Sequence, residues 1–302
     1  MRLTRPALLI ALLASLAVHA AAWAQEAAAP PARKPIRVAV IGASASAGFG
    51  CVYREKREDG DYAAGFRLIE MVKLACPELE LVTSDMSSGF FFMAPVRNGG
   101  KAAARAQEFG PDCVVALDFL FWYCYGDDAA DGTAIKSETD RLAKLERGLK
   151  ELEAFTVPVL VGDLPDMSRA EGKMLSATQI PAKDTLAKAN ARFAEWAKGR
   201  ANVRVLPLAS MQRQLMEQNA LEIGGKRLEG AKDMPLLQRD ELHPAPLGMA
   251  GLACAVADAL KDSLQGKVDC GPASCEPDPA QTIERARGVL KPSRVPAAAS
   301  TK

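Results

Sequence analysis

Short, almost entirely apolar runs recur along this chain of 302 residues, and the segments between them carry apolar residues at helical spacing. Runs of about four to eight residues rich in Val, Ile and Leu are typical of strands buried on both faces of a parallel sheet. Strands that alternate with helices predict an α/β domain with a five-stranded parallel sheet and helices on both of its faces. The five runs cover residues 36–41, 79–83, 113–120, 157–161 and 203–206.

Helices are expected where apolar residues recur every three or four positions. Ser137 suits the N-cap of one helix, because its hydroxyl can accept a hydrogen bond from the first turn. A Gly-Gly pair at 224–225 predicts a small hairpin. The other expected helices cover residues 62–76, 101–109, 185–198 and 246–264.

The N-terminus is typical of a secretory signal peptide over residues 1–24. Arg2 and Arg5 precede an apolar run over residues 7–22, and the Ala-Trp-Ala sequence that follows offers a small-x-small cleavage site. An uncleaved anchor is the alternative, but a membrane-spanning helix needs about 20 apolar residues. We therefore expect cleavage after Ala24 and a periplasmic or secreted protein.

The rest of the chain predicts one domain between two irregular ends. Residues 25–35 form an Ala/Pro linker, and residues 36–267 form the α/β domain. Residues 268–302 are rich in Pro, Ala and charge, a composition typical of disorder. Within this tail, Cys270 and Cys275 are the cysteines that we expect to close a disulfide-bonded loop, since disulfides persist in exported proteins.

Charge and residue usage exclude several classes of protein. The 38 basic residues are balanced by 37 acidic ones, so there is no electrostatic case for binding nucleic acid. The seven cysteines include no C-x-x-C pair, and two histidines are too few for a typical zinc site. We expect no metal or other cofactor, and no membrane-spanning segment after the signal peptide. Cys113, within an apolar run, is expected to be buried.

Histidine is scarce in this chain, which makes its position informative. His19 lies in the signal peptide, so His243 is the only histidine expected in the mature protein. Histidine is the side chain best suited to proton transfer near neutral pH. In the sequence D-E-L-H-P, Asp240 precedes His243 by three positions and can bond its second ring nitrogen, which fixes the tautomer and stabilises the imidazolium.

A serine lies where a parallel sheet binds its ligands. Ser44 belongs to a G-A-S-A-S-A-G turn over residues 42–48, directly after the first run. Ligands of such sheets bind beyond the carboxyl ends of the strands. A phosphate-binding loop is an alternative interpretation, but the chain lacks G-x-G-x-x-G and G-K-[ST], and this disfavours a nucleotide-dependent enzyme.

Taken together, these two segments resemble the first and last sequence blocks of the SGNH (GDSL-like) hydrolase family. The sequence P-D-C-V-V-A-L-D at 111–118 is similar to the strand that leads to the third block, and the resemblance covers about residues 36–265. It implies a flavodoxin-like three-layer α/β/α fold. It also implies an acyl-serine mechanism in which Ser44 is the nucleophile, His243 the base and Asp240 the residue that orients the histidine.

Two positions depart from the family pattern. Ala43 stands where the family has an aspartate before the serine. The third block usually supplies an asparagine to the oxyanion hole, but here the strand continues D-F-L-F-W over residues 118–122. Loss of one oxyanion donor lowers kcat by about 10²–10³. Asp118 itself is expected to hold a neighbouring loop, because a carboxylate would oppose the developing negative charge.

The resemblance also implies backbone donors for the oxyanion. The N–H of Ser44 is one, and Gly89, in S-S-G after the second run, is the second. Gly99 and Gly100 are the alternatives to Gly89, and Asn98 is a candidate to replace the missing amide.

Two further segments bear on the substrate. Residues 119–125 (F-L-F-W-Y-C-Y) are unusually aromatic; we expect at least half of them to pack in the core and the rest to line a pocket. Residues 167–180 form either a lid or a surface loop. We expect an exported serine hydrolase or acyltransferase acting on a small-molecule, glycan or lipid ester. The alternative is a non-catalytic carbohydrate- or lipid-binding protein on the same fold.

Overall fold

The computed structural model describes residues 34–266, 277–289 and 293–294. A five-stranded sheet lies at its centre, with the strand order β4-β1-β5-β6-β7 and all neighbours parallel. This order is the flavodoxin-like one, and it confirms the predicted fold class. The strands are β1 (Ile36–Val40), β4 (Leu81–Asp85), β5 (Cys113–Ala116), β6 (Val159–Gly162) and β7 (Val203–Leu206).

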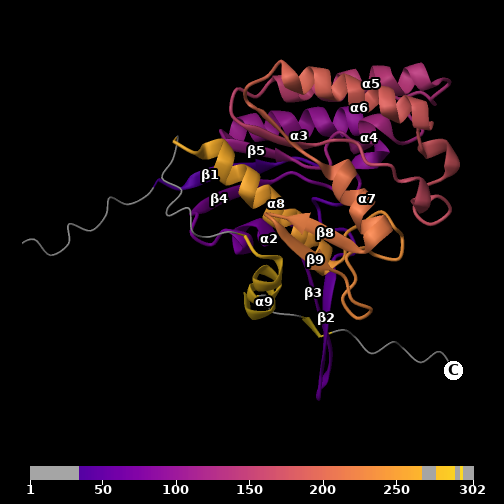
Figure 1. Cartoon of the computed structure of the whole chain (residues 1–302). Helices are drawn as coiled ribbons and strands as arrows, with labels where there is room; N and C mark the ends of the chain where they lie inside the picture. The colour runs from indigo at the N-terminus through magenta and orange to yellow at the C-terminus, as the bar shows by residue number, and fades with distance from the viewer. Residues whose placement is uncertain (1–33, 267–276, 290–292, 295–302) are drawn as a thin grey trace, which may run out of the picture. The chain divides into compact units, whose positions relative to one another are not determined.

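Helices cover both faces of the sheet (Figure 1). Their buried side chains and those of the strands form two separate apolar cores. Side chains of β1 alternate between them: Val38 and Val40 face one core, and Ala39 faces the other. The first core contains α2 (Leu68–Ala75) and α8 (Pro246–Leu264). The second contains α3 (Pro95–Phe109), α4 (Phe121–Cys124), α5 (Glu138–Glu153) and α6 (Lys183–Lys198).

Several sequence predictions are confirmed in detail. The N-cap at Ser137 is confirmed by a hydrogen bond from the Asp140 N–H to the Ser137 hydroxyl. The Gly-Gly pair joins β8 (Ala220–Ile223) to β9 (Lys226–Glu229), and both of its φ angles are positive, as the tightest hairpin turns require. Cys113 is fully buried, as expected.

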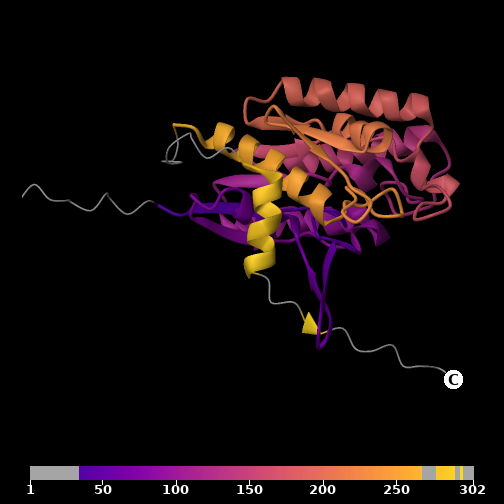
Figure 2. The same ribbon diagram turned by 60° about the horizontal axis from the view of Figure 1, so that its bottom comes forward.

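The predicted helix over 62–76 is wrong in its first part. Residues 62–65 belong to β3 (Gly60–Gly65), which pairs antiparallel with β2 (Val52–Arg57). The helix itself begins at Leu68. The Asp59-Gly60 sequence lies where the two-residue loop meets β3, and this local turn signal prevails over the apolar spacing further along. In Figures 1 and 2 the β2–β3 hairpin projects away from the central sheet.

The tail that composition predicts to be disordered contains a helix, α9 (Pro279–Val289), so that expectation is wrong there. Ile283 and Ala286 are buried where α9 lies against α8 and α2, and the Arg285 guanidinium donates to the Leu74 carbonyl. Tertiary burial therefore stabilises a helix of low mean hydropathy. Further along, β10 (Ser293–Arg294) pairs with β3. The predicted signal peptide and the Cys270–Cys275 loop lie outside the described residues.

Helix α7 (Leu208–Gln218) has no counterpart among the predicted helices. Within the described ranges the structure also contains the 3₁₀ turns η1 (Phe91–Met93), η2 (Ser168–Ala170) and η3 (Ala177–Gln179). Over the ranges that the structure describes, none of the helices combines the length and apolar character needed to cross a membrane.

The aromatic segment 119–125 is almost wholly core, which exceeds the expected half. All of its members are buried, and Phe121 alone among its aromatic residues also borders the pocket described below. Two tyrosines differ sharply in their polar contacts. The Tyr125 hydroxyl donates to the Pro165 carbonyl at 2.6 Å and accepts from the Met167 N–H at 3.1 Å. The Tyr123 hydroxyl is buried with no hydrogen-bond partner among the described residues.

These two tyrosines form a matched pair of stability tests. Tyr125→Phe leaves the Pro165 carbonyl and the Met167 N–H without their partner, so we expect a free energy of unfolding lower by about 1–3 kcal/mol. Tyr123→Phe removes a hydroxyl that makes no hydrogen bond, so we expect an unchanged or higher value. Urea denaturation of both variants checks this, and equal losses of stability would contradict it.

Candidate active site

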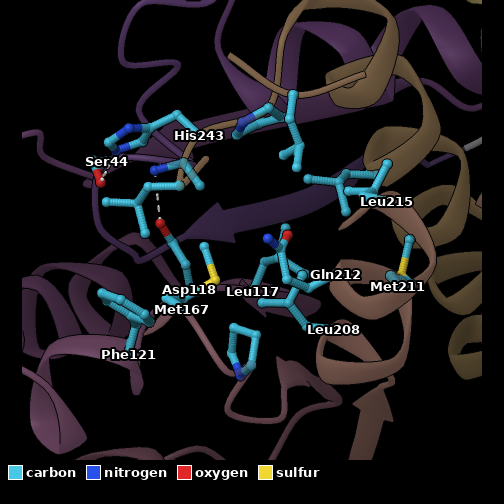
Figure 3. A pocket seen from close by; sticks show the side chains of 16 residues that line it. Ser44, Leu117, Asp118, Phe121, Met167, Leu208, Met211, Gln212, Leu215 and His243 are labelled. Carbon is cyan, nitrogen blue, oxygen red and sulfur yellow. Dashed lines mark hydrogen bonds between the residues drawn. The ribbon is translucent and has the colours of Figure 1, made fainter. Parts of the chain in front are cut away.

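The site lies where the sheet changes its winding direction. After β1 the chain reaches α2 on one face, whereas after β5 it reaches α4 and α5 on the other. The crevice beyond the carboxyl ends of two such neighbouring strands is where doubly wound sheets bind ligands. Ser44 follows β1 and Asp118 follows β5, so both side chains emerge at this crevice (Figure 3).

A continuous chain of hydrogen bonds joins three of the residues singled out from the sequence. The Ser44 Oγ lies 2.8 Å from Nε2 of His243, and Nδ1 of the same ring lies 2.8 Å from Oδ2 of Asp240. The histidine is buried, with 3% of its surface exposed. This arrangement orients the imidazole so that one nitrogen can take a proton from the serine while the other donates to the carboxylate.

The Asp240 carboxylate is held ionised by its own loop. Its Oδ1 accepts hydrogen bonds from the backbone N–H groups of Leu242 and His243, each at 3.0 Å. Burial alone would raise the pKa of Asp240, but the hydrogen bonds from the His243 ring and from these two N–H groups outweigh it and hold the pKa below its ordinary value. The carboxylate can therefore stabilise an imidazolium at neutral pH.

The loop that carries His243 is a tight turn held by ion pairs and hydrogen bonds to neighbouring segments. Glu241 adopts a left-handed φ of 52°, which is uncommon for a residue with a side chain. Its carboxylate pairs with Arg169 and Lys173 on the neighbouring segment. The Gln238 amide donates to the carbonyls of Phe49 and Pro244, and this links the turn to the Ser44 loop.

Asp118 organises the turn that carries the serine. Its Oδ1 accepts from the Ala43 N–H at 2.9 Å and from the Ser46 hydroxyl at 2.6 Å. Its Oδ2 accepts from the N–H groups of Ala45 and Ser46 at 2.9 and 3.1 Å. A Cβ atom on Gly42 would lie 2.4 Å from this carboxylate, so the glycine is what allows the close approach. The expectation that Asp118 holds a neighbouring loop is confirmed.

These contacts define which donors remain for an oxyanion. The N–H groups of residues 43, 45 and 46 point to Asp118, whereas the Ser44 N–H has no hydrogen-bond partner within the described ranges. The loop of Gly89 lies beside this turn, because the Ser88 N–H donates to the Gly42 carbonyl at 3.1 Å.

Asn98 and the alternatives to Gly89, namely Gly99 and Gly100, make contacts away from Ser44. The Asn98 amide donates to the carbonyls of Phe90 and Phe91, both at 3.3 Å. Gly99 packs on the Tyr123 ring, and Gly100 lies near Glu151. The structure therefore does not bring Asn98, Gly99 or Gly100 to the serine.

An apolar pocket opens beside Ser44 and His243 (Figure 3). Leu117, Phe121 and Met167 form one side of it, and α7 forms another. Sequence reasoning missed the residues of α7, although Leu208, Met211 and Leu215 recur at helical spacing and could have revealed them. The residues of α7 in the pocket wall are Leu208, Met211, Gln212 and Leu215.

The segment expected to be a lid or a surface loop contributes one wall residue. Met167 is buried, and its N–H is held by the Tyr125 hydroxyl. Ala170 and Leu175 are also buried, whereas Arg169 and Lys173 reach across to Glu241. The segment is thus a packed loop joined by ion pairs to the turn that carries His243, and this favours a surface loop over a lid.

Several solved structures are similar in fold to this chain. A putative acylhydrolase from Bacteroides fragilis is 15% identical, with a TM-score of 0.47 over 76% of this chain and 91% of its own. A GDSL-like lipase from Bacteroides thetaiotaomicron is 14% identical, with a TM-score of 0.44 over 76% and 89%. A gut microbial diltiazem-metabolizing enzyme is 10% identical, with a TM-score of 0.47 over 78% of this chain. The chain spans only 48% of the length of that enzyme.

No protein-family model and no curated protein matches the sequence. These similarities are low in both sequence identity and TM-score, so they describe the fold and not the chemistry of the site.

The role of Asp118 can be tested with an isosteric change. Asp118→Asn keeps the shape of the side chain but replaces an acceptor oxygen by an NH₂ group that faces N–H donors. We expect a free energy of unfolding lower by about 3 kcal/mol, because buried N–H groups lose their acceptor. Ser46→Ala removes only one of the hydrogen bonds and should cost about 1 kcal/mol. Equal effects of the two substitutions in urea denaturation would contradict this role.

Proposed function

We propose that the protein is an exported serine hydrolase that cleaves or transfers an acyl ester through an acyl-serine intermediate. In this proposal Ser44 is the nucleophile, His243 the general base and Asp240 the residue that orients the histidine. The observation that carries it is the unbroken hydrogen-bond chain from the serine hydroxyl to the Asp240 carboxylate, at 2.8 Å for each step, beside an apolar pocket.

The acylation step follows from this geometry. The Ser44 Oγ attacks the ester carbonyl carbon while Nε2 of His243 accepts the serine proton, and Asp240 stabilises the imidazolium that results. The carbonyl oxygen becomes an oxyanion, which the N–H groups of Ser44 and Gly89 would stabilise. When the carbonyl re-forms, the bond to the alcohol oxygen breaks and His243 donates the proton to the leaving alcohol.

Deacylation repeats the sequence with a second acceptor. Water, or another alcohol in a transferase, attacks the acyl-serine while His243 takes its proton. Collapse of this second intermediate releases the acid or the new ester, and the proton returns to the Ser44 oxygen. The product is set by which hydroxyl enters the site.

The oxyanion site of this proposal has two backbone donors and no asparagine. Removal of one donor from such a site costs about 10²–10³ in kcat. The proposed enzyme is therefore slower than one that keeps three donors, and its serine is activated mainly by the buried His243–Asp240 pair.

A second candidate function is a binding protein for a carbohydrate or lipid on the same fold. The missing asparagine favours it, and so do apolar side chains exposed near the site. The ring of Phe49 lies 4.7 Å from that of His243 and is 46% exposed. Phe90, which follows Gly89 in the loop after β4, is also exposed. Such side chains suit sugar rings and acyl chains.

Fluorophosphonate labelling separates the two functions. A fluorophosphonate reacts with a serine only where a base activates it, so the proposed enzyme should be labelled and mass spectrometry should locate the adduct on Ser44 rather than on Ser46. Ser44→Ala and His243→Ala should each abolish labelling. A folded protein that stays unlabelled would overturn the hydrolase proposal in favour of the binding protein.

Asp240→Asn tests the orienting role. Its Oδ1 can still accept the two backbone N–H groups, but an NH₂ group would face Nδ1 and favour the wrong tautomer. We expect kcat for an aryl ester to fall by about 10⁴-fold. Glu241→Gln, in the same turn, is the control for loop disturbance, and an equal loss in both variants would contradict the specific role of Asp240.

A further inference from the structure

One polar side chain lies among the apolar walls of the pocket. Gln212, on α7, is 6% exposed, and its Nε2 atom is buried with no hydrogen-bond partner in the described part of the chain. In Figure 3 its amide end points toward the middle of the pocket, between Asp118 and Leu215. The side chain also borders a polar groove outside α7, but the Nε2 atom itself is closed off from solvent.

This amide is unfavourable for the stability of the free protein. A buried N–H donor without an acceptor costs about 1–3 kcal/mol, whereas leucine or methionine would fill the same wall without that cost. Its neighbours on α7 that line the pocket, Leu208, Met211 and Leu215, are all apolar. The presence of the Gln212 amide in this apolar wall is explained if a bound ligand supplies the hydrogen-bond acceptor that Nε2 lacks.

The chemistry of the amide defines that partner. A carboxamide offers donors and an acceptor but no charge, and a hydroxyl group can satisfy both kinds of site. The pocket contains Ser44 and His243 at one end and Gln212 in its wall, so an acyl chain attached to the serine would extend toward the amide. An oxygen on that chain would meet Gln212, whereas a plain alkyl chain would leave the amide without a partner.

We propose that Gln212 is a specificity-determining residue that hydrogen-bonds a hydroxyl carried by the acyl chain of the substrate. The preferred esters are then those of hydroxy acids rather than of plain alkyl acids. This inference rests on the proposed function, because it assumes that the pocket receives the acyl group of an ester attacked by Ser44.

The test compares esters matched in shape. One pair is the 4-nitrophenyl esters of 3-hydroxybutanoate and 3-methylbutanoate, in which a methyl group replaces the hydroxyl. A longer pair is 6-hydroxyhexanoate and heptanoate. For at least one pair we expect kcat/KM to favour the hydroxy ester by about tenfold or more, because the apolar analogue leaves the buried amide unpaired.

Two variants in α7 test whether the preference for the hydroxy ester depends on Gln212. Gln212→Leu should abolish or reverse the ratio within that pair, and it should raise the midpoint of urea denaturation because an unpaired polar group is removed. Met211→Leu changes another wall residue of the same helix and should keep the ratio. The denaturation midpoint shows whether each variant is folded.

The outcomes separate this inference from the proposed function. A protein that is labelled at Ser44 and hydrolyses the esters, but prefers the alkyl member of both pairs or keeps its preference in Gln212→Leu, overturns the role of Gln212 alone. A folded protein that is neither labelled nor active on any of the four esters overturns the hydrolase proposal, and this inference fails with it.

Discussion

The interaction on which the site depends is the set of hydrogen bonds from the serine turn to Asp118. This carboxylate accepts from three backbone N–H groups and from the Ser46 hydroxyl, and it thereby fixes the turn that aims Ser44 at His243. The same contacts withdraw those N–H groups from any other acceptor. The position of the serine and the small number of free backbone N–H groups in its turn therefore have one physical cause.

Two buried cations of α5 hold the backbone of residues 124–126 in place. Arg141 donates to the carbonyls of Cys124 and Gly126, and Lys144 donates to the Tyr125 carbonyl at 2.8 Å. Burial lowers the pKa of Lys144 to about 8, so the ammonium is held there by carbonyl oxygens at a cost in desolvation. These bonds fix the backbone around Tyr125, whose hydroxyl in turn holds the loop of Met167 in the pocket wall.

The sequence predicted best what local patterns determine. The strands β5 and β6 are buried at every position and β1 at all but one, which is why their apolar runs stand out in the sequence. The Ser44, Asp240 and His243 segments were recognisable because each is a short string of unusual composition. Helix α9 was missed because the helices that bury it, α2 and α8, are not evident from its own composition. The first part of the 62–76 segment was mispredicted because its apolar spacing was given more weight than the hairpin turn that pairs it with β2. Gln212 could not be singled out either, because a glutamine becomes informative only when its surroundings are known to be apolar and without a partner.

The separations along the chain within the site have a consequence for how it assembles during folding. Asp240 and His243 are three residues apart and can meet as soon as their turn forms, whereas Ser44 and His243 are 199 residues apart. Contacts of such long range form late, because the loop between them must first be closed. The serine–histidine contact is therefore a marker of the completed native state, and the rate at which it appears would report the last step of assembly rather than the first collapse of the chain.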